Sequence, residues 1–290
     1  MHMKRIKSIF PMPALLALLA LQSGCAIVMD RVTGKIAGNL SSAILNQEDP
    51  ETVRDGAPAY LLLMDSMIEG NPESASALSS AANLYAAYGA VFVEDPERAK
   101  RLTRRAHEYG LRAMCVVHEP ACGWSEMDFA SFDADLETLT SDELPELYSF
   151  TVSSLAYTRA NSDDWGVLAE LPKVESALNR LYQLDSDYQS GAIHLYMGIL
   201  NTIRPPSLGG KPEVGREHFE KAIELSAGKD LSVKVEFARS YARLVYDREL
   251  HDSLLKDVIE SDPVQPGLTL FNTLAQRQAE RLLETADDYF

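Results

Sequence analysis

Apolar residues recur every three or four positions along most of the chain, and runs that alternate every second residue are short and rare. This spacing is typical of amphipathic α-helices, in which residues three and four apart share a face. Proline and glycine clusters interrupt the pattern at intervals of about 15–25 residues, which favours hairpins of helices. We therefore predict an all-α chain, with helices over approximately residues 30–46, 51–69, 73–93, 96–117, 141–160, 171–184, 187–203, 212–226, 230–246, 248–260 and 268–287.

Local signals support several of the predicted helix ends. Asp95-Pro96 and Lys211-Pro212 open helices, because a proline in the first turn lacks only an N–H that would have no partner there. Gly70-Asn71-Pro72 and Gly228 are typical stops. Residues 119–140 are rich in acidic residues and contain proline and glycine, so we predict a loop insert there.

The clearest repeated pattern lies within residues 194–226. Gly215 is followed by Phe219 four places on and by Ala222 three places after that, and the preceding helix carries Gly198. Small residues at this spacing let paired helices approach closely, and the aromatic ring fills the gap to the next pair. This is the pattern of a tetratricopeptide (TPR) repeat, and looser copies occur elsewhere. We predict a TPR-like helical-hairpin solenoid with degenerate repeats, a buried Phe219 and a C-terminal capping helix.

The beginning of the chain has the features of a targeting segment. Lys4, Arg5 and Lys7 precede an apolar run over residues 14–21, which is too short to span a bilayer. Small residues before Cys25 resemble a bacterial lipobox, in which a signal peptide is cleaved and the cysteine is lipidated. We predict a lipoprotein signal peptide over residues 1–24.

Two features bear on this anchor. Gln22 stands where a lipobox usually has an aliphatic residue, so an ordinary secretory signal with an incidental cysteine is the alternative. Ala26 follows Cys25 where aspartate would signal retention in the inner membrane. We therefore expect residues 25–290 to form a single domain in the periplasm, tethered by lipid to the inner leaflet of the outer membrane.

The charge of the chain excludes some partners. There are 43 acidic and 27 basic side chains, which gives a net charge of −16. A body this acidic repels phosphate backbones, so we expect no nucleic-acid partner. It also repels anionic headgroups, so contact with a membrane is expected through the lipid anchor only.

Two further cysteines stand close together in the sequence. Cys115 and Cys122 could form a disulfide in an oxidising periplasm, or remain free thiols. His118 between them suggests a metal site as a third reading, but a structural zinc site needs a fourth ligand that this stretch lacks.

The sequence contains no signature of catalysis. There is no HExxH, GxSxG, paired CxxC or complete P-loop, and Gly209-Gly210-Lys211 reads as a loop that enters a helix. We expect no enzymatic activity, no cofactor and no metal. Among the histidines, His218 is expected to face outward, whereas His194 and His251 fall near packed positions of the repeat.

Three segments of the chain resemble a known family. They are Val53–Asp65, Gly209–Leu255 and Leu268–Phe290, and they are similar to the T-component family of TPR-associated TRAP transporters. The resemblance implies a periplasmic lipoprotein of cryptic TPR helices. It also implies a homotrimer that associates with the substrate-binding P-component of a transporter for organic acids or other small ligands. A general TPR lipoprotein scaffold for envelope assembly, without a transport role, is the alternative function.

Substrates of such transporters are commonly carboxylates, which bind arginine or lysine in partly dry sites. The segment Arg54–Pro58 reads either as the start of a helix or as a polar bend that lines a cleft, and the apolar run Leu61–Met64 as core or as a partner surface. The candidate cleft residues are Arg54, Asp55, Arg204, Lys211 and Asn272.

Overall fold

A computed structural model describes residue 39 and residues 41–203 and 206–290. Within these residues every regular element is a helix, which confirms the all-α prediction for the described part of the chain. Cys25, Arg204 and most of the predicted helix at 30–46 lie outside the described residues. Residues 43–290 form one compact unit. None of the helices described has both the length and the hydropathy needed to cross a membrane.

The first half of this unit contains three long helices and an insert before α6. Its elements are α2 (Pro50–Gly70), α3 (Ala75–Val91), α4 (Pro96–Val117), η1 (Glu119–Gly123), α5 (Phe129–Leu136), η2 (Ser141–Glu143) and α6 (Leu144–Ala160).

The second half continues with shorter helices. Its elements are α7 (Trp165–Ala169), α8 (Leu171–Leu184), α9 (Tyr188–Thr202), η3 (Pro206–Leu208), α10 (Pro212–Leu225), α11 (Leu231–Glu236), η4 (Phe237–Ala242, a π-helix), α12 (Arg248–Glu260), α13 (Thr269–Glu284) and α14 (Ala286–Tyr289). The first turn of α9 passes through left-handed backbone at residues 189–191, with φ of 54°, 54° and 101°.

Aspartate and serine side chains begin many of these helices. Asp95 accepts a hydrogen bond from the N–H of Arg98 over 2.7 Å, and Asp247 accepts one from the N–H of Leu250 over 2.9 Å. Such caps satisfy N–H groups that have no partner inside the helix. Some of the acidic side chains of this chain therefore serve as helix caps.

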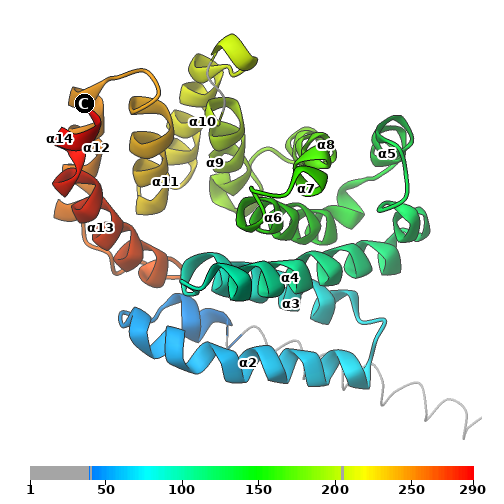
Figure 1. The fold of residues 1–290 in the computed structure, drawn as a ribbon. Helices are drawn as coiled ribbons and strands as arrows, with labels where there is room; N and C mark the ends of the chain where they lie inside the picture. The colour runs from blue at the N-terminus through cyan, green and yellow to red at the C-terminus, as the bar shows by residue number, and fades with distance from the viewer. Residues whose placement is uncertain (1–38, 40, 204–205) are drawn as a thin grey trace, which may run out of the picture. The chain divides into compact units, whose positions relative to one another are not determined.

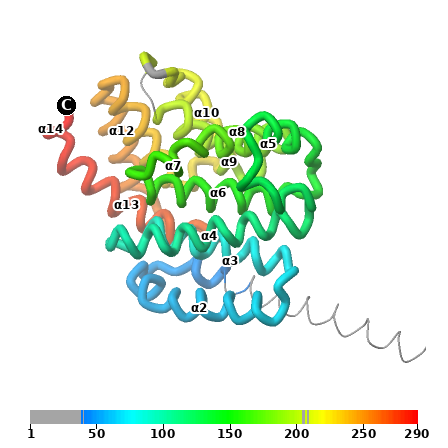
Figure 2. The backbone as a smooth tube through the Cα atoms, turned by 45° about the vertical axis from the view of Figure 1, so that its right-hand side comes forward, coloured from blue at the N-terminus to red at the C-terminus, as the bar shows by residue number. Residues whose placement is uncertain are grey.

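Consecutive helices pack in pairs, with α3 against α4, α9 against α10, and α12 against both η4 and α13. Figure 1 shows these pairs following one another along the chain, and Figure 2 shows α2, α3, α4 and α6 in succession. The last long helix, α13, packs against the first, α2. Arg277 on α13 forms an ion pair with Glu51 on α2 over 2.6 Å. The finer assignment of these pairs to a TPR-like solenoid remains a prediction.

The crossing of α9 and α10 is a very close helix contact. A Cβ atom added to Gly198 would stand 2.8 Å from the ring of Phe219, and one added to Gly215 would stand 2.6 Å from Cγ2 of Thr202. Phe219 is fully buried, which confirms its predicted position. The crossing of α4 and α6 is just as close, because a Cβ on Gly110 would lie 2.9 Å from the Cα of Phe150.

The predicted loop over residues 119–140 contains a 3-10 turn and a short helix instead. Asp128 caps this helix, α5, by accepting from the N–H of Ser131 over 2.9 Å. The indole N–H of Trp124 donates to Asp135 over 2.6 Å, and the ring packs on Phe132 with centroids 5.0 Å apart. The insert is therefore held by apolar and aromatic contacts, in a core that also includes Phe150 on α6 and Leu178 on α8.

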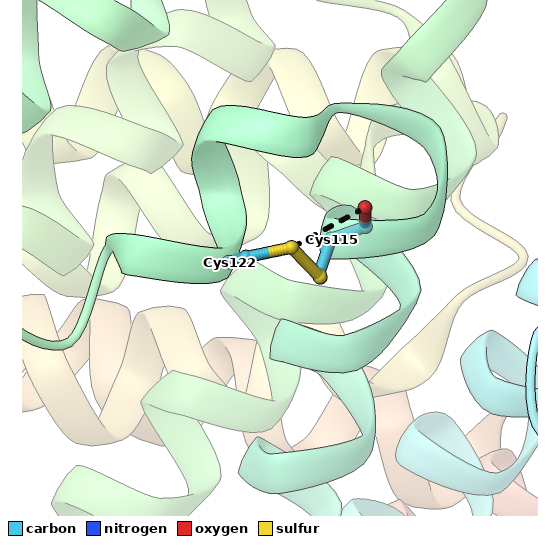
Figure 3. Close-up of a disulfide and its surroundings, with 2 residues drawn as sticks. All are labelled: Cys115 and Cys122. Atoms are coloured by element: carbon cyan, nitrogen blue, oxygen red, sulfur yellow. Dashed lines mark hydrogen bonds between the residues drawn. A yellow bond between two sulfur atoms is a disulfide. The ribbon is translucent and has the colours of Figure 1, made fainter.

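A disulfide joins Cys115, near the end of α4, to Cys122 in η1 (Figure 3). Because both sulfurs are in this bond, neither is available as a thiolate ligand, and His118 contacts Asp135 over 2.9 Å instead. The bond therefore ties the start of the insert to α4.

Substitution of Gly198 tests the close crossing. Gly198→Ala should lower the free energy of unfolding by about 1–3 kcal/mol, because overpacking against Phe219 outweighs the gain in helix propensity of about 1 kcal/mol. Gly56 is the matched control, since a Cβ there has no atom within 4 Å. Gly56→Ala should raise the stability by up to about 1 kcal/mol in urea unfolding. Equal effects of the two substitutions would contradict the packing described.

Reduction of the disulfide should lower the free energy of unfolding by about 2–3 kcal/mol, because the closed loop restricts the unfolded chain. The change is measured by urea unfolding with and without a thiol reductant. The double variant Cys115→Ser, Cys122→Ser is the control and should not respond to the reductant. An unchanged unfolding midpoint of the reduced wild type would show that the bond does not contribute to stability.

Candidate functional site

The predicted bend at Arg54–Pro58 lies inside α2, which runs unbroken from Pro50 to Gly70. Pro58 has no N–H, so the carbonyl of Arg54 loses its helical hydrogen bond. The hydroxyl of Tyr88 on α3 donates to that carbonyl over 3.2 Å. The structure thus has a continuous helix here, supported by a neighbouring tyrosine, in place of the polar bend.

The side chains of Arg54 and Asp55 form an exposed pair. Nε of Arg54 lies 2.9 Å from Oδ1 of Asp55, and the two side chains are 50% and 71% exposed. This hydrogen bond raises the pKa of Arg54 above its ordinary value. A guanidinium that is hydrated and already paired is a weak site for a ligand carboxylate.

The structure does not bring Lys211 to this pair. Lys211 is exposed and precedes α10, where its backbone N–H donates to the carbonyl of Asn201 over 2.8 Å. Arg54 lies on α2, which packs against α3 and α13. The two cations therefore belong to different helix pairs, and Arg204 is outside the described residues.

Asn272 is fully buried in α13 and is used within the fold. Its carbonyl oxygen accepts from the N–H of Leu231 over 2.9 Å, and its amide nitrogen donates to the carbonyls of Lys229 and Pro263 over 2.9 and 3.2 Å. The sequence had suggested that this amide lines a cleft. In the structure it is hydrogen-bonded within the fold and is therefore not available to a ligand. It fixes the backbone on both sides of Asp230.

Asp230 belongs to a cluster with three half-buried tyrosines of α6 and α9, which are Tyr148, Tyr188 and Tyr196. The rings of Tyr148 and Tyr188 meet edge to face with centroids 5.4 Å apart. Burial raises the pKa of Tyr196 to about 12 and that of Tyr148 well above its ordinary value. Burial also raises the pKa of the Asp230 carboxyl. The negative charge of Asp230 acts on both of these tyrosines.

A carboxylate that acts on this cluster is already paired with a cation. Glu236, whose charge acts on Tyr196, accepts two hydrogen bonds from Arg239 over 2.6 and 2.5 Å. The cluster therefore offers hydroxyl groups, ring edges and a carboxyl group. These groups suit a ligand with hydrogen-bond donors or an aromatic face, and they disfavour a free carboxylate.

A second candidate surface is the outward face of α2. Within the run Leu61–Met64, Leu61 and Met64 are buried, whereas Leu62 is 69% and Leu63 is 43% exposed. Ala59 and Ser66 are also exposed and complete a stripe at helical spacing. We call Ala59, Leu62, Leu63 and Ser66 the outer stripe. The buried stripe on the opposite face consists of Val53, Ala57, Leu61, Met64 and Ile68.

Comparison with known families covers almost all of this unit. Residues 46–290 match the family model described as TRAP transporter T-component. The chain belongs to the TRAP transporter T-component family. The match confirms the resemblance and gives the chain an accessory role in transport. Among curated proteins, no match is found.

In this T-component, sequence reasoning missed the tyrosine and aspartate cluster and selected cations instead. Tyr148 on α6 and Tyr196 on α9 lie 48 positions apart in the sequence, and no local motif joins them. The only local signal is Asp230, which is the first residue of the predicted helix over 230–246 and caps α11 in the structure.

The role of Tyr88 can be tested by a double-mutant cycle. Tyr88→Phe should cost about 1–2 kcal/mol of stability, because it leaves the Arg54 carbonyl without a partner. In a Pro58→Ala background the new N–H of residue 58 replaces the hydroxyl, so the same substitution should cost much less. Urea unfolding of the four proteins measures the coupling. Equal costs in both backgrounds would show that the hydroxyl does not compensate for the proline.

Proposed function

We propose that this T-component is a non-catalytic accessory protein that docks the substrate-binding P-component of a TRAP transporter. The observation that carries the proposal is the family match over residues 46–290, which includes every helix from α2 to α14. Members of the family are accessory components of transporters. This role favours the proposed function over a general scaffold for envelope assembly.

We infer that the protein works in the periplasm as a lipid-anchored homotrimer. The support comes from the sequence, in which Cys25 follows a short leader, and from the family resemblance. Attachment at the inner leaflet of the outer membrane would leave the helical unit beside periplasmic receptors. Its acidic surface would not adhere to anionic headgroups.

The outer stripe on α2 is our proposed docking surface for the P-component. Leu62 and Leu63 are adjacent and exposed, and the core of α2 is complete without them. Apolar side chains gathered on an exposed face often mark a contact surface. We therefore expect an interface that is largely packed rather than electrostatic.

The small ligand proposed for this family would contact the cluster of Tyr148, Tyr188, Tyr196 and Asp230. Half-buried hydroxyl groups and ring edges provide orientation together with partial desolvation. We base this assignment on the cluster rather than on Arg54 or Lys211, because those cations are exposed and belong to separate helix pairs.

The docking surface is tested with the double variant Leu62→Ser, Leu63→Ser. It should abolish binding to the P-component in a pull-down from periplasm and in titration calorimetry. Wild-type binding should survive 1 M salt, where screening acts over about 3 Å. Trp165→Ser is the control, since Trp165 is 84% exposed on α7 and should not affect binding.

Light scattering separates docking from self-association. If the double variant is monomeric and still binds the P-component, the outer stripe is a contact between copies, and the docking surface lies elsewhere. If a trimeric wild type shows no binding to any P-component, the proposed function is wrong.

A further inference from the structure

Two histidines meet between α9 and α10. Nδ1 of His194 lies 3.0 Å from Nδ1 of His218, and the ring centroids are 5.1 Å apart. His194 is buried, and His218 is half-buried. The sequence had predicted an outward-facing His218, which is wrong, because its ring turns toward the neighbouring helix.

The close crossing of the two helices sets this distance. Gly198 follows His194 by four residues, and Gly215 precedes His218 by three, so each glycine shares a helix face with its histidine. The ring of Tyr182 on α8 meets both imidazoles edge to face, with centroid distances of 5.4 Å. The pair is thus held on three sides by α8, α9 and α10.

We propose that His194 and His218 together bind one divalent transition-metal ion through their Nδ1 atoms, with Cu²⁺ bound most tightly. Two imidazole nitrogens at 2.0–2.1 Å from one ion, at an angle of roughly 90–110°, stand about 2.8–3.4 Å apart. The observed separation of 3.0 Å falls in this range. The two ligands are therefore already at chelating distance.

The protonation state of the two histidines also favours metal binding. Burial lowers the pKa of both histidines below the ordinary value, so both rings are neutral at pH 7 and keep a lone pair. In the hydrogen-bonded pair one Nδ1 carries the shared proton. Binding through both Nδ1 atoms moves that proton to Nε2 of the same ring, which changes the tautomer and releases no proton to solvent.

The surrounding charges favour a cation. Asp187 and Glu224 act on His194, and Glu217 acts on His218. Lys221 is the opposing charge, and it forms an ion pair with Glu224 over 2.8 Å. The acidic side chains therefore outnumber the cation around the pair.

The site has two protein ligands. Among the described residues, no group of three or more His, Cys, Asp or Glu side chains could hold a metal ion. Water would therefore complete the coordination. Imidazole suits zinc, nickel and copper, and the order of divalent affinities places Cu²⁺ highest. The half-buried edge of His218 gives the ion access.

Titration calorimetry with Cu²⁺ and Zn²⁺, on the full chain purified in detergent without a histidine tag, tests the site. We expect one equivalent of Cu²⁺, with Zn²⁺ bound more weakly. His218→Asn should weaken Cu²⁺ binding at least about tenfold, since even loss of a group that supports a ligand costs 10–100-fold. His118→Gln is the matched control, because that ring is paired with Asp135, and it should leave the affinity unchanged.

A spectroscopic measurement makes the result independent of variant folding. Electron paramagnetic resonance of the Cu²⁺ complex of wild-type protein labelled with ¹⁵N-histidine should show coupling to two imidazole nitrogens. Absence of Cu²⁺ binding, coupling to fewer than two imidazoles, or equal loss in both variants would overturn the proposal.

Discussion

The crossing of α9 and α10 leaves no room for a side chain at Gly198 or Gly215, and Phe219 fills the space between them. From there the packing extends to both neighbouring pairs. The ring of Phe219 stacks on Phe237 of η4, with centroids 5.1 Å apart, and on the other side the crossing brings His194 against Tyr182 of α8. Because a packed interior takes up an added methyl group only at a cost in stability, the close crossing constrains a set of contacts that links α8, α9, α10 and η4.

Much of the helical architecture could be predicted from the sequence, because its signals are local. Pro96 and Asp95 define the start of α4, and the observed bounds of α4, α8 and α12 are those predicted. The α5 helix escaped prediction because it is short. Its capping residue Asp128 is an ordinary turn residue, and its stability comes from contacts of Phe132 with Trp124. Such contacts have no periodic signature.

The candidate site was less accessible to sequence reasoning. Cations in an acidic chain attract attention, yet Arg54 is paired with its own neighbour on the surface. The missing hydrogen bond at Pro58 is supplied by Tyr88, which lies 30 residues further along the chain. Asn272 was selected for its amide, and that amide instead fixes the segment that presents Asp230. In each case the deciding partner comes from another helix.

The two faces of α2 have different physical roles. Its buried stripe packs on α3, in a core that also includes residues of α4 and α13, and this burial stabilises the helix against the unit. The ion pair of Glu51 with Arg277 involves exposed side chains and contributes little by comparison, although the hydrogen bond from Arg277 lowers the pKa of Glu51 to about 2. Leu62 and Leu63 therefore do not contribute to the core. Their exposure to water is unfavourable for apolar side chains. The helix α2 is held in the fold by one apolar face and exposes further apolar side chains on the other. It is therefore suited to contact another protein without altering its own core.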